Sequence, residues 1–111
     1  MTSWTRTLLM AMPALFALTA WAGEEVTVVI MRDMAFQPQE VTVRVGDTVR
    51  WENHERRQFH NVWFRELGED PSPYMFPDEH LEKTFGKPGV FPYVCEPHED
   101  RGMTGVVTVV E

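Results

Sequence analysis

Three residues that can bind a metal ion lie close together near the C-terminal end of the sequence. Residues 93–103 contain Cys95, the chain's only cysteine, followed by His98 and Met103. A thiolate, an imidazole and a thioether provide one strong soft ligand, one borderline ligand and one weak soft ligand. Copper uses such a set, and a second histidine would complete a trigonal His₂Cys arrangement with a long axial methionine. Structural zinc sites usually need two or more cysteines, so the single cysteine favours copper.

An isolated cysteine, histidine or methionine is most often structural, as a buried thiol, a surface imidazole or a core thioether. Two features favour a metal site here. A lone thiol in an exported protein is a liability unless it is paired or bound to a metal. The methionine also follows Cys-x₂-His at a spacing compatible with ligation. The sequence therefore predicts a metal centre at Cys95, His98 and Met103.

The missing ligand is expected on a distant strand, because rigid sites draw their residues from separate elements of the scaffold. His60 fits best, since Phe59 and the apolar residues 62–64 flank it. His54 lies in a charged stretch that is typical of a solvated turn. His80 follows two acidic residues, is expected to be exposed and is the second choice.

The first 22 residues have the composition of a secretory signal peptide. Arg6 is their only charge, residues 8–18 are mostly apolar, and residues 20–22 have the small-x-small pattern of a cleavage site. The apolar run is shorter than a membrane-spanning helix requires, and it contains Pro13. We predict export to the periplasm, cleavage after Ala22 and a single domain over residues 23–111. An uncleaved N-terminal anchor is the alternative.

Size and charge limit what the predicted mature chain can do. Cleavage would leave 89 of the 111 residues, enough for one small domain. All 17 acidic residues follow Ala22 whereas Arg6 precedes it, so the formal charge changes from −7 to −8. An acidic surface argues against nucleic acid and against anionic membranes, and favours a cationic partner. We predict a monomer with no nucleic-acid partner and no stable membrane insertion.

Apolar and polar residues alternate with a period of two through most of the chain. The expected strands cover residues 26–31, 41–45, 49–52, 60–64, 81–85, 89–95 and 104–110, with turn formers between them. Pro92 lacks a backbone donor, so its strand is expected at a sheet edge or bulged. Residues 66–82 are less regular and could hold a short helix or a loop. Seven or eight short strands predict an all-β fold, either a β-sandwich or a small barrel.

Alternate residues of such strands face the interior. The core candidates are Val28, Val43, Trp51, Phe85 and Val106.

Two longer motifs resemble those of the plastocyanin-type cupredoxins. The first is Val45-Gly-Asp-Thr-Val-Arg-Trp-Glu-Asn53, followed by Phe59-His60-Asn61-Val62. The second is Gly89-Val-Phe-Pro-Tyr-Val-Cys95-Glu-Pro-His98, followed by Gly102-Met103-Thr-Gly105-Val-Val-Thr-Val. The Cys-x₂-His-x₄-Met spacing is similar to that of plastocyanin and pseudoazurin, whereas amicyanin has a shorter loop. The resemblance covers nearly all of the predicted mature chain.

This resemblance implies a Greek-key β-sandwich that binds one copper ion. It implies His60, Cys95 and His98 as equatorial ligands and Met103 as the axial ligand. Asn61 would brace the ligand loop and help to place a backbone donor at the cysteine sulfur. The implied function is one-electron transfer between larger redox proteins, with copper cycling between Cu(I) and Cu(II). The acidic charge predicts partners with a basic docking face, such as a cytochrome.

The sequence departs from the family pattern in two places. Photosynthetic plastocyanins have a tyrosine immediately before the ligand cysteine, where this chain has Val94. An electron route through that ring is therefore not expected. The neighbours of His98 are charged, where the family often presents a more apolar docking patch. They are Glu96, Glu99, Asp100 and Arg101.

Two other functions compete with electron transfer. A copper-binding protein for tolerance or delivery could use the same fold, and Met31 and Met34 are spaced like a soft-metal pair. The more ordinary interpretation is that these methionines fill gaps in the packing. An enzyme such as a multicopper oxidase or a nitrite reductase would need further histidine clusters and another domain. We therefore predict a protein that is not an enzyme.

Overall fold

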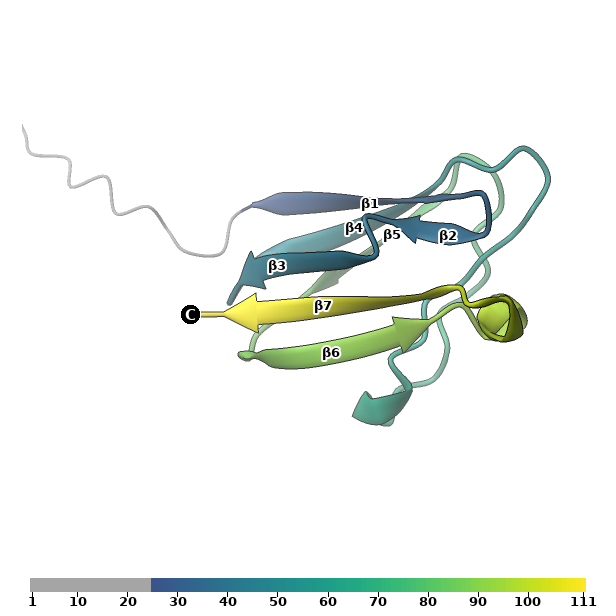
Figure 1. Ribbon diagram of the computed structural model, residues 1–111. Coiled ribbons are helices and arrows are strands. Elements are labelled where there is room, and N and C mark those ends of the chain that lie inside the picture. The colour runs from purple at the N-terminus through teal and green to yellow at the C-terminus, as the bar shows by residue number, and fades with distance from the viewer. Residues whose placement is uncertain (1–24) are drawn as a thin grey trace, which may run out of the picture.

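The computed structural model describes residues 25–111, and the predicted signal peptide, residues 1–22, lies outside them. The described residues form seven strands and two short 3₁₀ helices (Figure 1). The strands are β1 (Val26–Arg32), β2 (Ala35–Gln37), β3 (Glu40–Arg44), β4 (Thr48–Asn53), β5 (His80–Thr84), β6 (Gly89–Val94) and β7 (Thr104–Val110). The helices are η1 (Arg65–Leu67) and η2 (Glu96–Arg101). Within this part of the chain, no helix has the length and apolar character needed to cross a membrane.

The strands form two sheets that face each other as two layers (Figure 1). One sheet has the order β2-β1-β4-β5 and the other has the order β3-β7-β6. β1 and β4 are parallel, as are β3 and β7, and the other neighbouring strands are antiparallel. This arrangement confirms the predicted all-β sandwich.

Aromatic side chains from both sheets fill the space between the layers. The ring of Trp51 on β4 packs edge-on against Tyr93 on β6, with centroids 5.4 Å apart. Phe64, from the segment between β4 and η1, contacts both rings at centroid distances of 5.9 and 5.1 Å. A Cβ at position 105 would lie 2.4 Å from the Tyr93 hydroxyl, so this packing requires Gly105 on β7. Val43, Trp51 and Phe85 are buried, as predicted.

Two of the predicted core residues do not face the interior of the sandwich. Val28 is 41% exposed, whereas Val29 and Met31 on the same strand are completely buried. Val106 is only partly buried, and Val107 takes the core position on β7. Both strands have apolar residues on both faces, so alternation alone does not identify the inward face.

The predicted strand over residues 60–64 is also wrong. His60 forms an isolated antiparallel bridge with Met75, and Trp63 forms another with Val94. These residues therefore pair with two different segments and extend neither sheet. Pro92 lies on β6, which is an edge strand of its sheet, as predicted.

The two layers place η2 at one end of the sandwich (Figure 1). η2 follows β6 and precedes β7, and the C-terminus lies at the opposite end (Figure 1). Segments from other parts of the chain reach the same end, so it can gather residues that are far apart in sequence.

Candidate metal centre

The loop from Cys95 to Met103 is closed by its own backbone hydrogen bonds. The His98 N–H donates to the Cys95 carbonyl at 3.1 Å, and the Met103 N–H donates to the His98 carbonyl at 3.3 Å. The Cys95 N–H in turn donates to the Met103 carbonyl at 3.0 Å. Gly102 ends η2 with φ of 81°, a left-handed conformation that favours glycine. Three of the four predicted metal-site residues are therefore positioned by one compact loop.

His60 reaches this loop from a separate segment. Its backbone exchanges two hydrogen bonds with Met75, at 3.1 and 2.7 Å. The Asn53 amide group, at the end of β4, donates to the Gln58 and Met75 carbonyls at 2.9 and 2.8 Å. These contacts fix the backbone on both sides of His60, whose side chain is completely buried. The ligand predicted from its apolar neighbours thus lies beside the loop.

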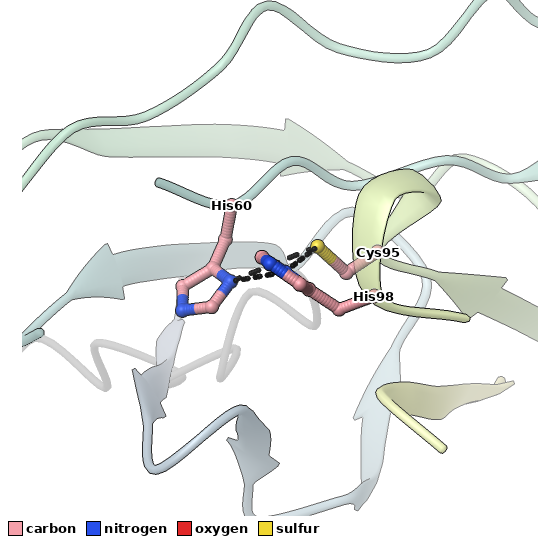
Figure 2. Close-up of side chains that lie close together, drawn as sticks. All are labelled: His60, Cys95 and His98. Atoms are coloured by element: carbon pink, nitrogen blue, oxygen red, sulfur yellow. Dashed lines mark hydrogen bonds between the residues drawn. The ribbon is translucent and has the colours of Figure 1, made fainter. Parts of the chain in front are cut away.

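Three donor atoms converge between these two segments (Figure 2). The Cys95 Sγ lies 3.7 Å from the His60 Nδ1 and 3.4 Å from the His98 Nδ1. The two Nδ1 atoms are 3.1 Å apart. Bonds between imidazole nitrogen and a metal such as zinc are about 2.0–2.1 Å long, so nitrogens at this separation can share one ion. All three residues are buried, and the nitrogen and sulfur donors suit copper.

The environment of the thiol favours its neutral form in the absence of a cation. Burial raises the pKa of the Cys95 thiol above its ordinary value. The backbone N–H groups of Asn61 and His98 favour the thiolate and lower this pKa in part, while the charge of Glu96 raises it. A bound cation would favour the thiolate strongly enough to displace the proton.

The two imidazoles are held in the neutral form that binds metals. Burial lowers the pKa of His60, and its contact with Glu55 offsets part of this effect. Burial also lowers the pKa of His98, aided by the charges of His60 and Arg101 and opposed by Asp100 and Glu55. A neutral imidazole keeps one nitrogen lone pair free, so both rings can donate to a metal near neutral pH.

Asn61 joins the two segments, as the resemblance implied. Its side-chain oxygen accepts the Glu96 backbone N–H at 2.8 Å, immediately after Cys95. Its backbone N–H also lowers the pKa of the Cys95 thiol. Met103 is the last residue of the loop, and its side chain is completely buried.

The other histidines lie outside this cluster. His54 is exposed at the molecular surface, with its ring nitrogens near Arg32 and Glu52 at 3.1 and 3.0 Å. His80 is exposed at the start of β5, as predicted.

Met31 and Met34 do not share an environment. Met31 is completely buried in the core on β1. Met34 is partly exposed in the turn between β1 and β2. Packing therefore explains Met31, and the spacing of the two residues does not identify a metal pair.

Two features of the site were missed in the sequence. Glu55, in the stretch interpreted as a solvated turn, places its Oε1 3.2 Å from the His60 Nε2. The ring of Phe59 lies near His98, with centroids 6.3 Å apart, and also packs against Tyr74 and Phe76. The position of Phe59 next to His60 was a usable signal, whereas nothing in the sequence places residues 74 and 76 beside it.

Comparison with known proteins agrees with this fold and donor set. The family model for the copper binding proteins of the plastocyanin/azurin family matches residues 24–110 of this chain. A plastocyanin from Scenedesmus fuscus is 36% identical over 87 residues, which cover 68% of this chain and 87% of the plastocyanin. An amicyanin from Paracoccus versutus is 32% identical over 109 residues, which cover 79% of this chain and 82% of the amicyanin. A halocyanin from Natronomonas pharaonis is 34% identical, with 83% of this chain and 61% of the halocyanin covered.

Solved structures show the same similarity. An oxidised amicyanin variant matches with a TM-score of 0.68 and 35% identity, over 76% of this chain and 81% of the amicyanin. A copper-containing nitrite reductase from Thermus scotoductus matches with a TM-score of 0.68 and 27% identity, but only 22% of that enzyme is covered. The fold and the donor set define a small type 1 cupredoxin. The chain belongs to the plastocyanin/azurin family of copper binding proteins, and copper is its cofactor.

Proposed function

We propose that this protein is an exported one-electron carrier, with a single copper ion bound by His60, Cys95, His98 and Met103. The first three residues would be the equatorial ligands and Met103 the weak axial ligand. The observation that supports this proposal is the convergence of one thiol and two imidazoles whose donor atoms all lie within 4.8 Å of one another. When bound, copper supplies the one-electron chemistry.

The chain's own residues hold the site in one arrangement. His60 is fixed by its backbone pairing with Met75, and the ligand loop is closed by its backbone hydrogen bonds. Asn61 links the two segments at 2.8 Å. A site that is held in place before and after transfer loses little energy to rearrangement, which suits a carrier that exchanges electrons repeatedly.

His98 is the proposed route for electrons between the site and a partner. It is 8% exposed, whereas the thiol and the other imidazole are completely buried. The exposed aromatic side chains of Tyr74 and Phe76, at 47% and 55%, adjoin it through Phe59. Glu96 and Asp100 add negative charge near the same ring. We propose a larger redox protein with a basic docking face, such as a cytochrome, as the partner of a monomeric carrier.

Export to the periplasm rests on the signal-peptide composition of residues 1–22. Mass spectrometry of the secreted protein tests it, with a mature N-terminus at Gly23 as the expected result. A mature chain that still begins with Met1 would support the uncleaved anchor instead.

The thiolate assignment can be tested by visible spectroscopy. Oxidised wild type should show intense thiolate-to-copper charge transfer, and Cys95→Ser should lose it. The same band in Cys95→Ser would contradict the proposed site.

A second test distinguishes His60 from the other histidines as the equatorial ligand. His60→Gly should open an equatorial position that added imidazole can refill, restoring the visible band. His80→Ala and His54→Ala serve as controls because both side chains are exposed. Loss of copper in His80→Ala but not in His60→Gly would overturn the assignment.

Copper tolerance or delivery remains the competing function. A carrier should show rapid electron self-exchange and should keep its copper in both oxidation states. Slow exchange, together with ready transfer of copper to a chelator, would instead support tolerance or delivery.

A further inference from the structure

The nitrogen of His60 that faces away from the other donors is buried and needs a hydrogen-bond partner. Its Nδ1 faces the Cys95 sulfur and the His98 Nδ1, so the proton of the neutral ring must lie on Nε2 when Nδ1 binds a metal. A buried N–H without an acceptor is costly. The identity of that acceptor therefore affects both the tautomer and the orientation of the ring.

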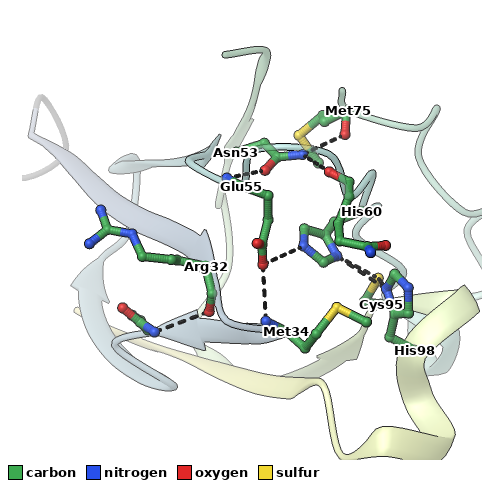
Figure 3. Close-up of polar contacts among 10 residues, drawn as sticks. Arg32, Met34, Asn53, Glu55, His60, Met75, Cys95 and His98 are labelled. Atoms are coloured by element: carbon green, nitrogen blue, oxygen red, sulfur yellow. Dashed lines mark hydrogen bonds and ion pairs between the residues drawn. The ribbon is translucent and has the colours of Figure 1, made fainter. Parts of the chain in front are cut away.

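Glu55 provides this acceptor (Figure 3). Its Oε1 lies 3.2 Å from the His60 Nε2, and its side chain is only 13% exposed. The same oxygen accepts the Met34 backbone N–H at 3.0 Å. The Glu55 backbone N–H donates to the Asn53 Oδ1 at 2.9 Å, so the residue is fixed at both its backbone and its side chain.

Met34 lies in an unusual turn. Asp33 and Met34 join β1 to β2, and both have positive φ angles, 56° and 57°. This is the backbone of a two-residue hairpin turn that normally favours asparagine or glycine. The turn directs the Met34 N–H at the carboxyl group that contacts His60. Glu55 thus connects the hairpin of β1 and β2 to the metal centre (Figure 3).

We infer that Glu55 is a positioning residue that fixes the His60 tautomer and, through its negative charge, lowers the reduction potential of the copper site. This inference rests on the proposed function. A carboxylate that accepts a hydrogen bond from the Nε2–H makes the ring a stronger donor through Nδ1. A nearby negative charge also stabilises the more positive oxidation state, and limited solvent exposure strengthens this effect.

Three variants separate hydrogen bonding from charge. Glu55→Gln keeps an oxygen acceptor and removes the charge, whereas Glu55→Ala removes both. Glu96→Gln removes a charge from a residue next to Cys95 without contacting His60, and is the matched control. The potential of each copper-loaded protein is measured at one pH by redox titration.

Glu55→Gln should shift the one-electron equilibrium at least tenfold toward Cu(I), which is about 59 mV. Glu96→Gln should shift it several-fold less. Equal shifts in these two variants, or a shift below twofold in Glu55→Gln, would overturn the inference. Absence of the charge-transfer band in wild type would instead refute the proposed function, so the two failures can be distinguished.

The tautomer is tested by NMR of the diamagnetic Cu(I) protein. The His60 Nε2–H should exchange slowly in wild type and in Glu55→Gln, and rapidly in Glu55→Ala. Glu55→Gln keeps the experiment decisive if Glu55→Ala does not fold. Slow exchange in Glu55→Ala, or rapid exchange in wild type, would show that Glu55 does not hold this proton.

Discussion

The side-chain oxygen of Asn61 accepts the backbone N–H of Glu96 at 2.8 Å, although the two residues are 35 positions apart. This bond joins the segment that contains His60 to the loop that contains Cys95 and His98. The Asn61 side chain is buried, so the bond is protected from water. Together with the bridge between Trp63 and Val94, this amide group fixes the relative placement of the two halves of the site.

Asn61→Ala should destabilise the metal-free protein by about 1 kcal/mol, because one buried hydrogen bond is lost and its donor is left without a protein acceptor. Urea unfolding monitored by tryptophan fluorescence measures this change. Gln39→Ala is the matched control, since its amide makes a longer, exposed contact with Thr104 at 3.4 Å. Its effect should be within about 0.5 kcal/mol. Equal losses in the free energy of unfolding of both variants would show that the Asn61 hydrogen bond contributes no more than the exposed Gln39 contact.

The local part of the metal site could be predicted from the sequence. Cys95, His98 and Met103 lie in one short segment, and their chemistry is independent of the rest of the fold. His60 could be chosen among the histidines because its neighbours are apolar and those of His54 are charged. The resemblance to cupredoxins added Asn61 as a brace of the ligand loop, and its contact with the Glu96 backbone agrees with that role.

The role of Glu55 could not be predicted, because it depends on contacts between distant segments. Its carboxyl group accepts the backbone N–H of Met34, and its own backbone N–H donates to the Asn53 side chain. A charged stretch of sequence, taken alone, predicts side chains that are exposed to solvent. The inward faces of β1 and β7 were missed for a different reason. Val28 and Val29 are equally apolar, so only the position of the second sheet determines which one is buried.

Met103→Leu should keep copper and the charge-transfer band while raising the reduction potential by about 59 mV. This is roughly a tenfold shift of the one-electron equilibrium toward Cu(I). The reason is that the oxidised site loses a weak donor and gains apolar surface. Redox titration measures the change. Met31→Leu is the control, because Met31 is equally buried but lies in the core on β1. A lowered potential, or loss of the metal, would contradict the axial assignment of Met103.

Copper affinity should depend on pH with a slope set by the Cys95 proton. Burial raises the pKa of this thiol, so the metal-free protein holds the proton that copper must displace. Burial lowers the pKa of both His60 and His98, so neither ring needs to lose a proton above about pH 6.5. The apparent affinity should therefore rise about tenfold per unit between about pH 6.5 and 8. Competition with a Cu(I) chelator measures it, and a pH-independent affinity would show that the thiol is already ionised.

Charged side chains surround the proposed electron route at His98. Glu99 forms an ion pair with Arg65 at the surface, so its charge is partly neutralised. Glu96 and Asp100 are exposed beside His98, and with the exposed Arg101 they leave one net negative charge on this part of the surface. Complementary charges accelerate association, and salt screens them with a Debye length of about 8 Å at physiological ionic strength. Electron transfer with a basic cytochrome should therefore slow by tenfold or more between low and high salt.

The competing explanation is that the net charge of the whole protein, rather than the local surface, produces any salt dependence. Glu96→Lys combined with Asp100→Lys should flatten the dependence if docking occurs near His98. Glu25→Lys combined with Glu111→Lys makes the same change in net charge just before β1 and at the C-terminus, which lies at the opposite end of the sandwich (Figure 1). This second pair should leave most of the dependence intact, because those positions lie far from the docking face. Second-order rate constants across an ionic-strength series measure both variants. Parallel curves for the two pairs would remove the docking role from Glu96 and Asp100 and leave only the net charge of the protein as the cause.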